Sequence, residues 1–301
     1  MQQLPLSASE TSRDACTQCL LSNVLSSAEL QQLNGWLDAR DGVDVEAGGT
    51  GLGPWSGNVL LRDDAEELDY FTRHPNLLPF VKGLYGDGNE RFAQFDFRQT
   101  RAKEGPGTMA FHHDATLPQR TMRQPYGPAD WICSIVYLTD VDVDSPAFAV
   151  VPRSVRYEPI QQAKAQMGED YVEQALWGPA GTAVFYDTAT YHTRLDSLTG
   201  DKGRRTMHQY WSRGGYLDFP PNPQATHDNP KIQEFLRTQS QTRPPTPNLT
   251  DWVRMPKRLA AHPDPEIRIF YSHWNTGMSE WAARDWEGDG TRGGQVVEKK
   301  E

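Results

Sequence analysis

GTAVFYDTATYHTRLDSLTGDKGRRTMHQYW, residues 181–211, is the stretch that decides the fold. Its first part, 181–187, is a glycine-led apolar run typical of a strand, and His192 follows after a short turn. The turn cluster at 200–203 then leads into a second strand candidate, 204–211, which is rich in aromatic residues and opens with Arg204 and Arg205. Pairing of a strand that carries a histidine with a strand that opens with arginine would place a guanidinium near any metal bound by that histidine.

Upstream of this stretch lies the triplet His112-His113-Asp114. In an extended segment residues i and i+2 project from the same face, so His112 and Asp114 can reach one ion while His113 points away. With His192 they would supply two imidazoles and one carboxylate, which leave the other coordination positions open, as in non-haem Fe(II) oxygenases. An H-x-D triplet also arises by chance among surface polar groups, so the triplet alone does not establish a metal site.

The order of these features resembles the phytanoyl-CoA dioxygenase-like branch of the Fe(II)/2-oxoglutarate oxygenases. The resemblance covers about residues 90–215: H-x-D, an apolar strand ending in Asp-Val at 140–141, the segment DSPAFAVVPRS at 144–154, a glycine-led strand, His192 and an arginine a dozen residues later. The family usually has Asn-Gly before the central apolar stretch and Pro-Gly-Ser-His after it, where this chain has Asp-Ser at 144–145 and Pro-Arg-Ser-Val at 152–155. These departures lie outside the metal set, so they bear on the subfamily more than on the chemistry.

The resemblance implies a mainly β fold with flanking helices, built on a double-stranded β-helix core of the jelly-roll, cupin-like type. It implies that His112, Asp114 and His192 hold Fe(II) and are the catalytic set, with 2-oxoglutarate and O2 as co-substrates. Arg204 would bind the far carboxylate of 2-oxoglutarate, because a guanidinium offers two parallel donors to a carboxylate. Arg205 stays an alternative, since the linker after His192 is one residue longer than usual.

The activity that follows from the resemblance is oxidation of a small metabolite with release of succinate and CO2. We expect an anionic substrate from secondary or amino-acid-derived metabolism, bound by Arg98, Arg120 or Arg123, although a solvated arginine is the ordinary alternative for each. The outcome can be hydroxylation, desaturation or oxidative ring closure, and the sequence does not choose among them. A halogenase is disfavoured because Asp114 leaves no ligand position for chloride.

Two other classes of protein use the same residue types. A metal-dependent hydrolase could use the same three ligands, but it would not need Arg204. A non-catalytic metal- or ligand-binding jelly-roll protein would leave the three ligands together with the arginine unexplained. Succinate formation separates the first alternative from the oxygenase, and metal analysis of anaerobically purified protein bears on the second.

Composition predicts one domain over residues 1–286, with a charged, glycine-rich tail at 287–301 that we expect to be disordered. The chain has 301 residues, 37% of them hydrophobic, and a net charge of −10 with a pI near 5.3, which argues against nucleic acid as partner. No apolar run reaches the length of a membrane span, and the start lacks a signal-peptide pattern. Three cysteines fit a reducing compartment, so we expect a cytoplasmic protein. The oligomeric state is not predicted.

Local patterns predict the elements around the core. Ser26 and Glu29 have capping-box spacing for a helix over about 26–37, and a short helix is expected at 76–84. A strand at 91–100 enters the core, residues 118–128 form a long loop of the kind that often covers a substrate, and 160–177 is a helical insert. Cys16 and Cys19 are placed on an N-terminal turn or helix. The proline-rich part after 219 is expected to wrap the core without adding a second one.

Overall fold

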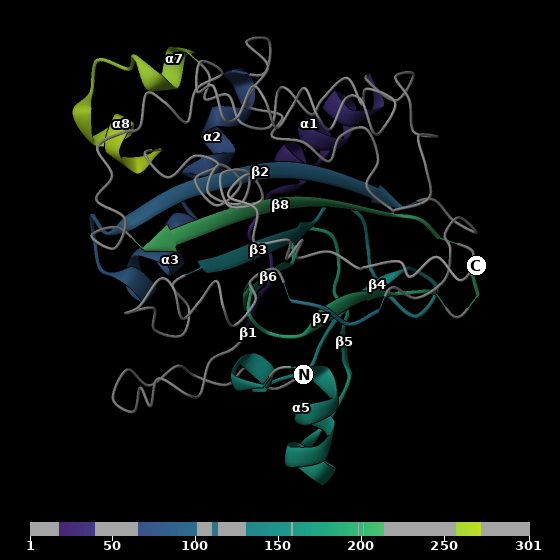
Figure 1. Ribbon diagram of the computed structural model, residues 1–301. Helices are drawn as coiled ribbons and strands as arrows, with labels where there is room; N and C mark the ends of the chain where they lie inside the picture. The colour runs from purple at the N-terminus through teal and green to yellow at the C-terminus, as the bar shows by residue number, and fades with distance from the viewer. Residues whose placement is uncertain are drawn as a thin grey trace, which may run out of the picture.

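Two antiparallel sheets face each other in the computed structural model, which describes residues 18–39, 66–100, 110–113, 131–157, 159–197, 199–200, 202–213 and 257–271 (Figure 1). The larger sheet has the order β1 (Gln18–Leu21), β6 (Ala183–Asp187), β3 (Trp131–Tyr137), β8 (Arg204–Arg213), β2 (Glu90–Thr100). The smaller sheet has the order β5 (Gln174–Leu176), β4 (Ala147–Val150), β7 (His192–Leu195). This arrangement confirms the jelly-roll fold expected from the sequence.

Helices cover the outer face of the larger sheet. They are α1 (Ser27–Asp38), α2 (Asp69–Thr72), α3 (Leu78–Tyr85), α7 (Lys257–Ala260) and α8 (Pro265–Phe270), with the short 3-10 turn η2 (Glu66–Leu68) before α2. Their apolar side chains share one core with outward-facing residues of the strands, such as Phe97 on β2 and Met207 and Trp211 on β8. Each of these three strand residues is at most 1% exposed, so this face is sealed by packing.

A second core fills the space between the two sheets. Its members include Cys133 and Ile135 from β3, Tyr186 from β6, and Phe148 and Val150 from β4. Beyond the smaller sheet lies α5 (Ile160–Met167) (Figure 1). The 3-10 turn η3 (Ser154–Arg156) precedes α5 in the chain, and η4 (Gly168–Asp170) follows it. The outer core therefore anchors the helices, and the inner core sets the distance between the faces that carry the candidate site.

Several expected elements occur where the sequence placed them, and two do not. The helix at 26–37 has its capping box, the short helix begins two residues later than expected, at Leu78, and β2 spans the predicted strand. The predicted helical insert at 160–177 was wrong in its second half, because Gln174–Leu176 forms β5 and pairs with β4. Cys19 lies on edge strand β1, not on a turn or helix, because residues 18–21 pair with β6.

Other expectations concern parts of the chain outside the described residues. These are Cys16, the loop at 118–128, the proline-rich region from 219 to 256 and the tail at 287–301. Within the described ranges, no helix is long and apolar enough to cross a lipid bilayer.

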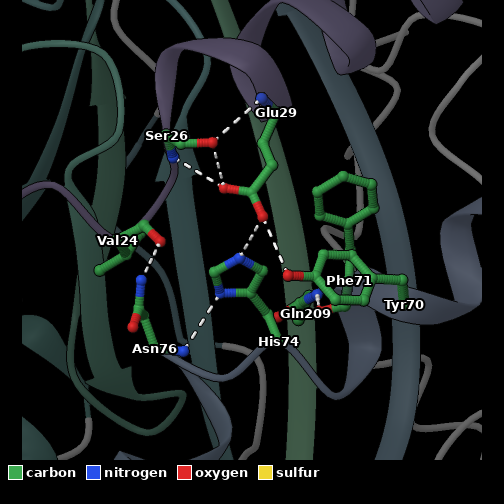
Figure 2. Close-up of polar contacts among 8 residues, drawn as sticks. All are labelled: Val24, Ser26, Glu29, Tyr70, Phe71, His74, Asn76 and Gln209. Carbon is green, nitrogen blue, oxygen red and sulfur yellow. Dashed lines mark hydrogen bonds and ion pairs between the residues drawn. The ribbon is translucent and has the colours of Figure 1, made fainter.

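The carboxylate of Glu29 joins the start of α1 to α2 and to the segment between α2 and α3 (Figure 2). One oxygen accepts hydrogen bonds from the backbone N–H and the hydroxyl of Ser26, each at 2.7 Å. The other accepts from the Tyr70 hydroxyl at 3.0 Å and from Nε2 of His74 at 2.9 Å. His74 Nδ1 accepts from the Asn76 backbone, so the proton of this buried ring lies on Nε2. Burial works to raise the pKa of Glu29, but these hydrogen bonds outweigh it and lower the pKa to about 2.

We predict that Glu29→Gln destabilises the protein at neutral pH by about 1–3 kcal/mol, because an amide cannot accept all four hydrogen bonds. The folded-state pKa lies below the ordinary value of 4.5, so the stabilisation by the carboxylate is fully present above 4.5 and is lost as the pH falls towards about 2. Urea unfolding of both proteins should therefore show a difference in the free energy of unfolding that shrinks on acidification. Glu169→Gln, at an exposed position, is the control and should change little. An equal loss in both variants would contradict the role of the network.

Candidate active site

Two predicted metal ligands from distant parts of the chain lie side by side. His112 and His192 form an isolated antiparallel bridge, in which the N–H of each residue donates to the carbonyl of the other at 3.0 and 2.8 Å. Their ring centroids are 4.6 Å apart. Directly paired residues of antiparallel strands project from the same face, so both imidazoles point to one side of this bridge. His192 is buried at 5% exposure, whereas His112 is exposed.

The tautomer of each ring is fixed by a backbone carbonyl. Nδ1 of His112 lies 3.0 Å from the carbonyl oxygen of Ala110, and Nδ1 of His192 lies 2.8 Å from that of Thr190. A carbonyl only accepts, so Nδ1 must carry the proton in both rings and the lone pair is on Nε2. Metal-binding histidines are oriented in this way by a donor contact from the second nitrogen. In both rings Nε2 is thus the atom that is available to bind a metal.

His192 is positioned by the loop that follows β4. The Ser154 hydroxyl accepts a hydrogen bond from the Tyr191 N–H at 2.8 Å, and the Val151 N–H donates to the Tyr191 carbonyl at 2.8 Å. Arg153 adopts φ 63°, in the left-handed region that favours glycine. This is the position at which the related family usually has the glycine of its Pro-Gly-Ser sequence, so the backbone turn is kept here despite a side chain that disfavours it.

His113 lies on the other side of the strand, as expected from alternation. Its ring is 4.9 Å from that of Tyr191, which belongs to a separate small core with Val151 and Ala163. The third predicted ligand, Asp114, lies outside the described residues, as do Arg120 and Arg123. The structure therefore brings together two of the three predicted ligands and separates His113 from them.

Arg204 is buried on the inner face of β8, where it is 6% exposed. Burial lowers its pKa to about 10, with the nearby cations of Arg194 and Arg98 acting in the same direction and Tyr137 opposing them. The group stays protonated at neutral pH. Its Nη1 atom has no hydrogen-bond partner among the described residues. A buried donor without a partner is costly, and an anionic ligand is one group that can satisfy it.

Arg205 points to the opposite side of the sheet. Its guanidinium pairs with the carboxylate of Asp38 at the end of α1, at 2.6 Å, and Nε donates to the side chain of Gln99 at 2.9 Å. Alternation along β8 explains the difference, since neighbouring residues of a strand face opposite ways. Of the two candidate arginines, Arg204 alone faces the interior between the sheets.

Arg98 also faces this interior. It is the register partner of Thr206, two residues beyond Arg204 on β8, and its Nη2 donates to the Tyr210 hydroxyl at 3.2 Å. Its charge contributes to the lowered pKa of Arg204, so the two guanidiniums are near neighbours.

Sequence reasoning missed three residues of this interior face: Tyr137, Arg194 and His208. Tyr137 is fully buried and donates to the Leu176 carbonyl at 2.6 Å; burial raises its pKa to about 12, so it stays protonated. Arg194 and His208 are 7% and 3% exposed. Arg194 lies two residues after His192 and His208 four after Arg204, spacings that keep a residue on the same strand face and could have identified both.

The residues present fit a metal and an acidic co-substrate. Imidazoles with Nε2 available as ligand atoms suit a divalent iron. The Nη1 of buried Arg204, which no described residue contacts by a hydrogen bond, suits a carboxylate. Iron and 2-oxoglutarate together would occupy the interior between β7 and β8.

Comparison with known proteins supports this assignment at the level of family and fold. The family model described as phytanoyl-CoA dioxygenase matches residues 18–206. The 2-oxoglutarate-dependent carbocyclase SnoK from nogalamycin biosynthesis matches in structure with 19% identity over 66% of this chain and 80% of its own, at a TM-score of 0.52. The epimerase SnoN of the same biosynthesis has 18% identity over 65% of this chain and 78% of its own, with a TM-score of 0.51. AviO1 from Streptomyces viridochromogenes has 16% identity over 65% of this chain and 89% of its own, with a TM-score of 0.50. No curated protein matches the chain in sequence.

We predict that His112→Ala and His192→Ala each lower iron affinity at least about tenfold, since loss of outer-shell partners alone costs that much. His113→Ala is the matched control, because its ring faces Tyr191. Iron content after anaerobic reconstitution, measured by elemental analysis, checks the result. Full occupancy in His192→Ala would contradict the metal assignment.

Proposed function

Because the chain belongs to the phytanoyl-CoA dioxygenase family, it is an iron- and 2-oxoglutarate-dependent dioxygenase that uses O2, and we propose that it oxidises a small anionic metabolite. The catalytic metal set in this proposal is His112, Asp114 and His192, and Arg204 binds the far carboxylate of 2-oxoglutarate. The observation that carries the co-substrate assignment is the buried Arg204 guanidinium on the interior face, whose Nη1 has no hydrogen-bond partner in the part of the chain that the structure describes.

The protein residues in this scheme bind, orient and exclude water. The carbonyls of Ala110 and Thr190 hold the two rings with Nε2 towards the metal. Arg204 orients the co-substrate, and the buried Tyr137 beside it keeps water away from the charge pair. When bound, iron with 2-oxoglutarate and O2 supplies the oxidising power, with succinate and CO2 as co-products.

Arg98 supports an anionic substrate. It reaches the interior from β2, and its contact with the Tyr210 hydroxyl holds the guanidinium on that face. Arg120 and Arg123 stay in the proposal as further contacts from the sequence. Two structural neighbours are an epimerase and a carbocyclase, so the fold does not fix the outcome of oxidation. Hydroxylation, desaturation and ring closure remain the outcomes to be tested, and we propose a role in secondary or amino-acid-derived metabolism, in the cytoplasm.

The proposed function is tested by succinate release. Iron-loaded protein is incubated with 2-oxoglutarate, O2 and a panel of carboxylated metabolites, and both succinate and product are followed by mass spectrometry. We expect substrate-stimulated succinate formation that stops when iron is chelated. Turnover of a panel compound without any need for 2-oxoglutarate would instead point to a hydrolase.

We predict that Arg204→Gln raises the KM for 2-oxoglutarate at least about thirtyfold, since loss of a buried charged contact costs about 2–5 kcal/mol. Arg205→Gln is the matched control on the neighbouring residue, and it should leave this KM unchanged. It removes contacts on the helix side of the sheet, namely the ion pair with Asp38 and hydrogen bonds to Gln99 and Asn34, which together contribute about 1–2 kcal/mol to stability. The reverse result would mean that Arg205 is the co-substrate arginine.

We also predict that carboxylated substrates are turned over faster than their methyl esters, and that Arg98→Ala removes most of this preference. The physical reason is that esterification removes the charge that the guanidinium binds. Initial rates for acid and ester pairs, with wild type and variant, provide the measurement. Equal rates for acid and ester, unaffected by Ala at 98, 120 or 123, would show that the substrate is not held by its carboxylate.

A further inference from the structure

His208 is a buried imidazole on the interior face that the metal and co-substrate assignments leave unused. It lies on β8, is 3% exposed and contacts the Thr206 hydroxyl through Nε2 at 2.9 Å. Its second nitrogen, Nδ1, is buried and has no hydrogen-bond partner among the described residues. Within the described ranges, Nδ1 of His208 and Nη1 of Arg204 are thus two polar atoms without a hydrogen-bond partner on one face of one strand.

The strand registers place His208 between His192, a proposed metal ligand, and Arg204. Tyr186, whose ring is 4.8 Å from that of His192, shares a row across the sheet with Cys133 and Tyr210. The next row along β8 contains His208, and Arg204 lies four residues further along the same face. A ligand that extends from the metal side of the sheet to Arg204 therefore passes the row of His208.

The contact with Thr206 engages Nε2 of His208 at 2.9 Å, and the same hydroxyl lies 3.4 Å from the Arg98 carbonyl. A neutral ring carries one proton, which is on Nδ1 when the hydroxyl donates to Nε2 and on Nε2 when the hydroxyl donates to the Arg98 carbonyl. The first tautomer makes Nδ1 an N–H donor, the group that an anionic oxygen requires.

Electrostatics keeps this ring neutral. Burial holds the pKa of His208 well below its usual range, and the charges of Arg98 and Arg204 lower it further. With its proton on Nδ1, His208 adds a neutral, directional donor to a region where Arg98 and Arg204 already supply positive charge. A neutral donor can bind a carboxylate oxygen without the cost of burying one more cation.

We propose that His208 is a ligand-binding residue of this site, whose Nδ1–H donates to a carboxylate oxygen while Thr206 holds the ring through Nε2. The carboxylate belongs to 2-oxoglutarate or to the anionic substrate. This inference rests on the proposed function, because it places the contact in the same active site.

Three substitutions separate ligand binding from a structural role. His208→Asn places an amide N–H near the position of Nδ1 and lacks the Nε2 contact. His208→Gln places its amide near Nε2 and lacks Nδ1, and His208→Phe keeps the ring shape without either nitrogen. Folding of each variant is checked by circular dichroism and thermal unfolding. If one of them fails to fold, the comparison of the remaining variants with wild type still separates ligand binding from a structural role.

The first arm titrates full-length, Fe(II)-loaded protein with 2-oxoglutarate in the absence of O2, using the visible charge-transfer absorbance of the complex. The second arm measures KM for the carboxylated panel compound that gives the most succinate with wild type. We expect His208→Gln and His208→Phe to raise either the Kd for 2-oxoglutarate or the KM for the panel compound about tenfold or more. His208→Asn should stay close to wild type in both. A change in the first arm assigns the carboxylate to 2-oxoglutarate, and a change in the second alone assigns it to the substrate.

Two results overturn the inference. If all three variants match wild type in both arms, Nδ1 contacts neither ligand. If His208→Gln matches wild type while His208→Asn is impaired, the ring acts only through its bond to Thr206. Failure of wild type itself to bind 2-oxoglutarate would overturn the proposed function as well, so the two failures are distinguishable.

Discussion

Side-chain alternation along β8 is the constraint on which the rest of this structure depends. Residues with odd numbers, such as Met207 and Trp211, face the helical layer and are sealed in the outer core. Residues with even numbers, such as Arg204 and His208, face the smaller sheet. A shift of the strand by one residue would exchange the two sets, burying Arg205 between the sheets and moving Arg204 towards the helices. Packing of apolar side chains on the outer face therefore fixes the chemistry of the inner face.

The inner face carries buried polar atoms to which no described residue of the protein makes a hydrogen bond. Arg204 is charged and buried, and one of its nitrogen atoms has no partner among the described residues; the same holds for Nδ1 of His208. Each such group costs about 1–3 kcal/mol in the free protein. An anion that binds there recovers this cost, and it meets donors whose orientation is already set by the strands. The outer core and networks such as that of Glu29 provide stability that offsets the unsatisfied groups.

Much of the secondary structure could be predicted because its signals are local. The capping box at Ser26 and Glu29 and the aromatic strand after Arg204 depend on neighbouring residues only. β5 was missed because three residues of a short strand carry no periodicity, and only pairing with β4 makes them a strand. Edge strand β1, which contains Cys19, was also missed, because it is short and becomes a strand only through pairing with β6. Arg194 and His208 were overlooked although both lie on a face shared with a predicted site residue.

The sequence by itself determined the class of chemistry, because metal ligands and a carboxylate-binding arginine must be particular residue types in a particular order along the chain. It also determined that His113 faces away from His112, since alternation in an extended segment is a local property. Only the tertiary structure decided that Arg204 faces the interior and Arg205 faces Asp38. The sequence favoured Arg204 but left Arg205 as an alternative. The register of β8 against β3 and β2, which separates the two arginines, arises from hydrogen bonds and packing between segments far apart in the chain.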